Sequence, residues 1–119
     1  MMKSRVFPLE ADVRFSDESA TVTEIIQTEN ASIAIWGVKP GQIVEAHCHP
    51  DGQDTWVMLR GTLTYYLGNG ESQSLNVGQV AIAEKNQIHG AVNDNSEDAV
   101  FISIYSAIAT WLRTGITLS

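Results

Sequence analysis

The stretch GQIVEAHCHPDGQDTWVMLRG, residues 41–61, contains two strand-like segments joined by a tight turn. The first segment, residues 43–49, ends at the Pro-Asp-Gly triplet of residues 50–52, where proline presets φ and glycine accepts a positive φ. The second segment covers residues 54–67, with a bend expected at Gly61. The stretch therefore predicts extended chain that changes direction at a short turn.

The same alternation of short strand candidates and turn residues continues through the rest of the chain. The further candidates are residues 21–28, 32–38, 80–83, 89–93 and 99–106, and the further turns are Lys39-Pro40-Gly41 and Asn69-Gly70. Helical periodicity is almost absent, and we expect a short helix only in the last dozen residues, around Trp111 and Leu112. Many short strands at close spacing predict an all-β sandwich or barrel.

The composition is that of one globular domain, because 44% of the 119 residues are hydrophobic and only 18% are charged. We therefore expect residues 1–119 to form a single domain. The first 13 residues lack the apolar core of a signal peptide, and the most apolar run, residues 99–109, is about half the length of a membrane-spanning helix. The single cysteine, Cys48, cannot form an internal disulfide. These features predict a soluble cytoplasmic protein.

The net charge is −7, from 14 acidic and seven basic residues. The basic residues form no cluster along the sequence; they are Lys3, Arg5, Arg14, Lys39, Arg60, Lys85 and Arg113. Nucleic acids and anionic membranes bind grouped lysines and arginines, so we expect neither as a partner. A small anionic ligand would need positive charge from another source, such as a bound metal ion.

The histidines gather where such an ion could bind. Residues two apart in a strand point to the same face, so His47 and His49 are expected to face one way and Cys48 the other. The turn after them is expected to fold the next strand back beside them, with Asp54 opposite the histidine pair. The third histidine, His89, opens another strand candidate.

Three imidazoles and a carboxylate suit one divalent transition metal ion, Fe, Mn, Ni, Zn or Cu, better than Ca or Mg. The alternative is structural. A lone histidine such as His89 is more often a packed or exposed residue than a ligand, and an H-x-H pair without context only suggests a metal site. The flanking glycines give the pattern more weight.

With those glycines, the spacing resembles the two motifs of the cupin superfamily, in its small single-domain, conserved-barrel type. The first motif, G-x5-H-x-H-x3-4-E-x6-G, is matched within residues 41–61 by Gly41, His47, His49, Asp54 and Gly61. The second, G-x5-P-x-G-x2-H-x3-N, is matched in spacing within residues 78–93 by Gly78, Glu84, Asn86, His89 and Asn93. The resemblance implies a double-stranded β-helix (jelly-roll) barrel with a metal ion inside. It also implies the ligands, which are His47, His49 and His89, with Asp54 at the position of the family's glutamate.

Three positions depart from the family pattern. Asp54 is shorter than glutamate by about 1.5 Å, so its strand lies closer or it binds through water, and a three-histidine site is the alternative. Glu84 replaces a proline, and we expect a looser turn before His89. Asn86 replaces a glycine, and we expect the backbone to be preserved because asparagine tolerates the left-handed region.

Several apolar residues close to these ligands have two interpretations. Trp56 and Met58 share the parity of Asp54 and should point into the barrel, either as core or as the wall of a substrate pocket above the metal. Trp36 could join that pocket. Cys48 is expected to be a small packed residue, or else to lie at a contact between sheets or subunits.

A metal ion with open coordination positions can polarise a substrate, bind O₂ or activate water. We therefore expect a metal-dependent enzyme, such as a dioxygenase or an isomerase, that acts on a small organic molecule, with oxygenase-type chemistry favoured by analogy with the fold family. The alternative is a non-catalytic module that binds or senses a small molecule. The resemblance also implies a homodimer, for which residues 99–109 with Trp111 and Leu112 offer apolar surface.

Overall fold

The described part of the chain is built entirely from antiparallel strands, turns and loops. The computed structural model describes residues 4–10 and 13–107. The strands within these ranges are β1 (Thr21–Gln27), β2 (Ala31–Val38), β3 (Ile43–His47), β4 (Gly52–Arg60), β5 (Thr62–Gly68), β6 (Glu71–Asn76), β7 (Val80–Ala83), β8 (His89–Val92) and β9 (Ala99–Ala107). The predicted all-β class is confirmed, whereas the helix expected around Trp111 lies outside the described residues. Within the described ranges, no helix is long and apolar enough to cross a membrane.

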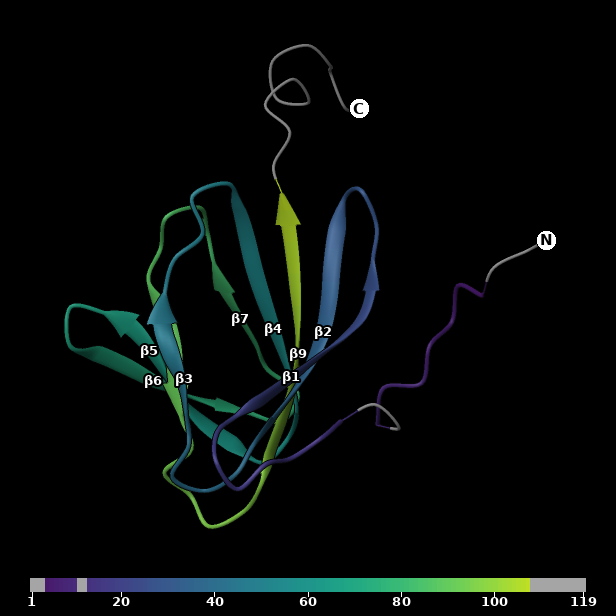
Figure 1. Ribbon diagram of the computed structural model, residues 1–119. Helices are drawn as coiled ribbons and strands as arrows, with labels where there is room; N and C mark the ends of the chain where they lie inside the picture. The colour runs from purple at the N-terminus through teal and green to yellow at the C-terminus, as the bar shows by residue number, and fades with distance from the viewer. Residues whose placement is uncertain (1–3, 11–12, 108–119) are drawn as a thin grey trace.

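The strands form two sheets that face each other, with orders β1-β2-β9-β4-β7 and β3-β8-β5-β6 (Figure 1). The pairing is nested around the β5–β6 hairpin: β4 pairs with β7, β3 with β8 and β2 with β9. One long antiparallel hairpin, wound alternately through two layers, is the double-stranded β-helix or jelly roll. The fold expected from the motif resemblance is therefore confirmed.

The hydrophobic core lies between the two sheets because alternate side chains of each strand point inward. β4 shows this most clearly, since every second residue from Gly52 to Met58 is buried. The core cluster comprises Val38, Val44, Trp56, Met58, Leu63, Tyr65, Leu75, Ala91, Ala99 and Phe101. Its β9 members, Ala99 and Phe101, are fully buried, so the start of the apolar run of residues 99–109 packs inside the chain, in a strand between β2 and β4.

The sequence pattern did not predict β6. The turn before it was predicted, and Asn69 and Gly70 both have positive φ values, 56° and 77°, as a two-residue hairpin turn requires. β6 itself is polar and mostly exposed, and only Leu75 in it is buried. Because β6 pairs only with β5 among the described strands and lies at the edge of their sheet, it needs little apolar surface.

The strand after the Pro-Asp-Gly turn does not fold back beside β3, as we expected. β3 pairs with β8, whereas β4 belongs to the opposite sheet and pairs with β7 and β9. The turn therefore carries the chain from one layer to the other. Asp54 consequently faces the histidines across the barrel and not along a ladder.

The connection between these strands also contains Cys48, which is exposed. The expectation of a packed cysteine is wrong because β3 ends at His47, so that Cys48 lies in the connection beyond the sheet.

The turn before His89 is well closed, and the expected loosening is not observed. The backbone N–H of Glu84 donates to the side-chain oxygen of Gln87 (2.8 Å), and the backbone N–H of Gln87 donates to the carbonyl oxygen of Glu84 (2.9 Å). Proline has no N–H and could not make the first bond. Asn86 has a φ of 68°, so the preserved left-handed backbone at the motif glycine is confirmed.

Candidate metal centre

His47 and His89 lie directly opposite each other in the β3–β8 ladder. Their ring centroids are 4.2 Å apart. Gly90 allows this close approach: a Cβ built there would lie 2.8 Å from the carbonyl oxygen of Val44 and 2.9 Å from the Cα of Ala46. The sequence analysis did not single out Gly90, because its close approach to β3 depends on strand pairing.

His49 lies two residues beyond the end of β3, at the more open side of the group. Its backbone carbonyl accepts a hydrogen bond from the N–H of Asn86 (2.8 Å), which ties this segment to the turn before His89. Its ring lies 4.8 Å from that of Tyr105, centroid to centroid. Its side chain is 32% exposed, against 1% for His89, and His47 is also partly exposed, so these two histidines form the accessible side of the group.

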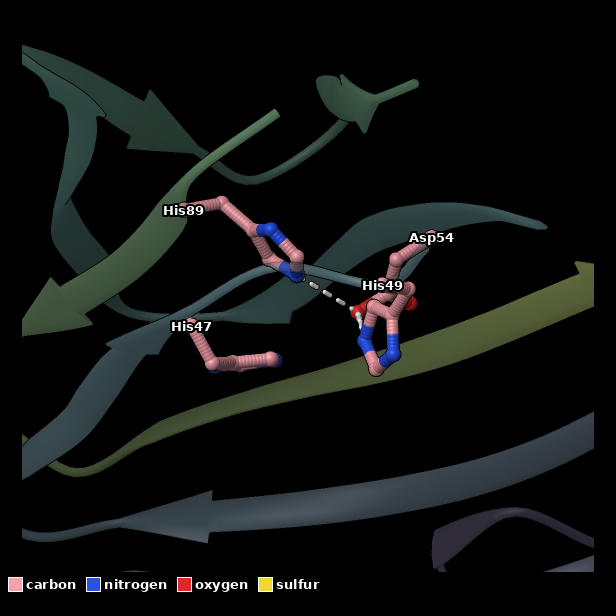
Figure 2. A group of neighbouring side chains, drawn as sticks. All are labelled: His47, His49, Asp54 and His89. Carbon is pink, nitrogen blue, oxygen red and sulfur yellow. Dashed lines mark hydrogen bonds and ion pairs between the residues drawn. The ribbon is translucent and has the colours of Figure 1, made fainter. Parts of the chain in front are cut away.

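Asp54 completes the group from β4, in the facing sheet (Figure 2). Its Oδ2 lies 2.9 Å from Nε2 of His89 and 3.5 Å from Nε2 of His49. One ligand atom from each of His47, His49, Asp54 and His89 lies within 4.8 Å of the others. The aspartate therefore reaches the histidines directly, although it is shorter than the glutamate of the family motif.

Two backbone carbonyls determine which nitrogens of the histidine rings carry protons. Nδ1 of His47 lies 2.7 Å from the carbonyl oxygen of Glu45, and Nδ1 of His89 lies 3.1 Å from that of Gln87. A carbonyl oxygen only accepts hydrogen bonds, so each Nδ1 carries the proton and Nε2 of the neutral ring has a free lone pair. Metal-binding histidines are commonly oriented in this way by a carbonyl on the outer nitrogen.

This assignment brings two acceptors face to face. With a neutral His89 ring, Nε2 and the ionised Oδ2 of Asp54 both present lone pairs, 2.9 Å apart. Such a contact is favourable only with a proton or a metal ion between the groups. Oδ1 of the same carboxylate is buried and has no hydrogen-bond partner among the described residues. The donor set and this unpartnered oxygen fit a transition metal ion.

Burial and hydrogen bonding act in opposite directions on the carboxylate. Burial alone would raise the pKa of Asp54. When a proton lies between Nε2 of His89 and the carboxylate, that hydrogen bond and the one from the Trp56 indole outweigh burial, and the pKa of Asp54 lies below its usual value. Burial lowers the pKa of His49, and the charge of Asp54 only partly opposes this effect. Both shifts favour the forms that bind metals, an ionised carboxylate and a neutral imidazole.

Tyr65 adds a second unpartnered group to the barrel interior. Its hydroxyl oxygen is buried without a hydrogen-bond partner among the described residues, and its ring stacks at 6.5 Å from that of His89. Burial, and then the charge of Asp54, raise the pKa of Tyr65 to about 12. The hydroxyl therefore keeps its proton at neutral pH.

The three residues expected to line a substrate pocket lie on the inner face of the barrel. Trp56 and Met58 are each 1% exposed in the hydrophobic core, and the partly buried Trp36 packs against that core. Their contact with a substrate stays a prediction. The sequence analysis missed one contact: the indole N–H of Trp56 donates to Oδ2 of Asp54 at 3.1 Å. The only sequence signal for this contact was that Asp54 and Trp56 are two residues apart in one strand, so that their side chains point to the same face.

The fold and this cluster define a double-stranded β-helix protein with a candidate metal centre of three histidines and an aspartate. The family model described as Cupin domain matches residues 34–105. The chain therefore belongs to the cupin domain family. The match includes all four residues of the cluster.

One protein of known structure resembles this chain in both sequence and fold, and a more distant one resembles it in fold alone. A Klebsiella pneumoniae protein of known structure, described as an uncharacterized conserved protein with a double-stranded beta-helix domain, is 35% identical, with a TM-score of 0.85 over 88% of this chain and 91% of that chain. A predicted oxalate decarboxylase from Thermotoga maritima is 19% identical, with a TM-score of 0.70 over 75% of this chain and 81% of that one, and it shares the fold.

A nitrosourea synthase from Streptomyces achromogenes subsp. streptozoticus is 33% identical to this chain over 61 residues. The match covers 51% of this chain but only 12% of that enzyme. The chain thus corresponds to a small part of the curated relative.

Proposed function

We propose that this cupin is a metal-dependent enzyme that acts on a small organic molecule with oxygenase-type chemistry. One divalent transition metal ion, Fe, Mn, Ni, Zn or Cu, would be held by His47, His49, Asp54 and His89. The observation that carries the proposal is the convergence of their ligand atoms, with two outer ring nitrogens held by carbonyl oxygens. A metal ion bound there would supply Lewis-acid or redox chemistry to a small molecule at its remaining coordination positions.

The chain's own residues determine how a substrate would approach. His89 and Asp54 are buried, whereas His47 and His49 are partly exposed, so a small molecule would enter from the side of these two histidines. Tyr105, whose ring lies beside that of His49, is the residue best placed to contact it. On the inner side, the buried rings of Trp56 and Tyr65, whose centroids lie 5.8 and 6.5 Å from that of His89, would exclude water from the ligands.

The similarity to nitrosourea synthase supports a catalytic role, because that protein is by name an enzyme. The match covers a small part of that enzyme, so the similarity does not identify a reaction or a substrate. We therefore propose only the class of reaction for this chain.

The test uses O₂ uptake by the purified protein, loaded with Fe(II) and supplied with a panel of diols, thiols and ketoacids. We expect substrate-dependent uptake with at least one compound, and none with the His47→Ala/His89→Ala variant. Absence of uptake across the panel would contradict the oxygenase proposal. A compound that stabilises the protein against heat and is recovered unchanged would identify a binding or sensing module instead.

We also propose a homodimer. Ala99, Val100 and Phe101 at the start of β9 are buried within the chain. Among the described residues, exposed apolar side chains of β7 and the following loop support the dimer: Val80, Ile82 and Ile88. The sedimentation mass tests this proposal, and a mass equal to one chain would contradict it.

A further inference from the structure

Trp56 occupies a position that links the hydrophobic core to the candidate metal centre. Its ring stacks on Phe101, with centroids 4.1 Å apart, and meets the Tyr65 ring edge-on at 5.1 Å. These contacts fix the direction of the indole N–H, which donates to Oδ2 of Asp54 at 3.1 Å. The same oxygen faces His89 and His49.

A second tryptophan, which is partly buried, shows that an indole N–H can be satisfied without a carboxylate. Trp36 also stacks on Phe101, at 5.6 Å, and its N–H donates to the neutral hydroxyl of Ser103 at 3.1 Å. Burying a carboxylate is unfavourable unless a cation or several hydrogen bonds compensate it. Core packing alone therefore does not explain why the indole N–H of Trp56 is hydrogen-bonded to a carboxylate.

We infer that Trp56 is a positioning residue of the metal centre, whose indole N–H holds the short Asp54 carboxylate in the orientation that binds a divalent transition metal ion. Asp54 and Trp56 are two residues apart on β4 and both point inward, so one rigid strand sets their relation. This contact accounts for the tolerance of aspartate at a glutamate position of the family motif. The inference rests on the proposed metal site and adds a residue that is not itself a ligand.

The test compares Trp56→Phe with the matched variant Trp36→Phe, because each change removes one indole N–H from a ring stacked on Phe101. We expect Trp56→Phe to raise the Kd for Zn(II) and Co(II) about 10- to 100-fold, as for other groups that orient metal ligands. Trp36→Phe should leave the Kd within about twofold. The Kd values are measured by competition with a chromophoric chelator, and unfolding curves report whether each variant is folded.

A double-variant cycle tests whether Trp56 acts through Asp54. In an Asp54→Ala background, Trp56→Phe should change the Kd by no more than about twofold, because the carboxylate that it orients is gone. The visible spectrum of bound Co(II) should change in Trp56→Phe and not in Trp36→Phe. A Kd unchanged by Trp56→Phe, an equal effect of the two variants, or an undiminished effect without Asp54 would overturn the inference.

A measurement on the parent protein keeps the inference testable if Trp56→Phe does not fold. With ¹⁵N-labelled protein, Zn(II) should shift the indole N–H resonance of Trp56 more than that of Trp36. The Trp36→Phe and Trp111→Phe variants assign the other two indole signals. If Zn(II) binds but the indole N–H resonance of Trp56 does not shift, the inference about Trp56 is overturned and the proposed function is not. If the parent protein binds no metal, both are overturned.

Discussion

Asn93 and Asp54, buried polar side chains from the two cupin motifs, differ in how their hydrogen bonds are satisfied. The side-chain amide of Asn93 donates to the carbonyl oxygens of Val38 (2.9 Å) and Glu97 (2.8 Å), and its oxygen accepts from the N–H of Asn95 (3.0 Å). Among the described residues, Asp54 by contrast has three nitrogens around Oδ2 and no hydrogen-bond partner for Oδ1. The side chain of Asn93 therefore has its hydrogen bonds satisfied, whereas the carboxylate of Asp54 keeps an oxygen that can accept a further hydrogen bond or bind a metal ion.

The difference separates a structural role from a functional one. The backbone of Asn93 also exchanges hydrogen bonds with Gly41 and Gln42, so this residue joins the end of the second motif to the start of the first. Native proteins rarely bury a polar atom without a partner, and the exceptions concentrate where a ligand binds. Asn93 therefore holds the fold, and Asp54 is available for a metal ion.

The largest expected effect on stability is that of Asn93→Ala. The change removes the side-chain partner of the carbonyl oxygens of Val38 and Glu97 and of the N–H of Asn95, the first of these bonds buried and the other two partly buried. This loss should lower the free energy of unfolding by about 3 to 5 kcal/mol. Denaturant unfolding measures this loss, with Asn30→Ala at an exposed turn as the control, where we expect a change below about 0.5 kcal/mol. Equal stability of the two variants would contradict a structural role for Asn93.

The Asp54→Asn variant tests whether the carboxylate of Asp54 binds a metal ion. In the parent, a metal ion at 100 times its Kd should raise the free energy of unfolding by about 2.7 kcal/mol. The variant should lose most of this increase, because it keeps the shape of the side chain but not the negative charge. Its metal-free form should be somewhat less stable than the parent's at neutral pH, because the lowered pKa of Asp54 means that the folded protein favours the ionised carboxylate. Thermal unfolding with and without Zn(II) measures both quantities, and undiminished metal stabilisation in the variant would show that Asp54 is not a ligand.

The histidine part of the site was predictable from sequence, and the environment of Asp54 was not. His47 and His49 are two residues apart in a segment that the sequence predicts to be a strand, so local spacing indicates that they act together, although β3 ends at His47. The position of Asp54 depends on which sheet β4 joins, and that is decided by pairings with β7 and β9. The contact from Trp56 likewise depends on the inward face of that strand.

The fold shows the same division between local and long-range information. Turns such as Asn69-Gly70 and the left-handed Asn86 have local signatures, and both were predicted. The edge strand β6 has almost no apolar face, so no periodicity marks it. Cys48 was misplaced because parity continues only as long as the strand does, and β3 ends one residue earlier.

The smallest expected effect concerns the turn that carries the chain to His89. Asn86→Ala should lower the free energy of unfolding by about 1 kcal/mol, because alanine is unfavourable at a φ of 68°. Asn86→Gly should change it by less, since glycine adopts this region readily. Denaturant unfolding of the two variants measures the difference. If alanine were tolerated as well as glycine, the left-handed backbone would not matter at this position.

The most direct test of the central claim, that the cluster of His47, His49, Asp54 and His89 is a metal site, is elemental analysis of protein purified without added metal. The His47→Ala/His89→Ala variant is analysed beside it. We predict near one equivalent of a transition metal in the parent and none in the variant. No metal in the parent, even after reconstitution with Fe(II), Mn(II), Ni(II) and Zn(II), or an equal metal content in the variant, would contradict the claim.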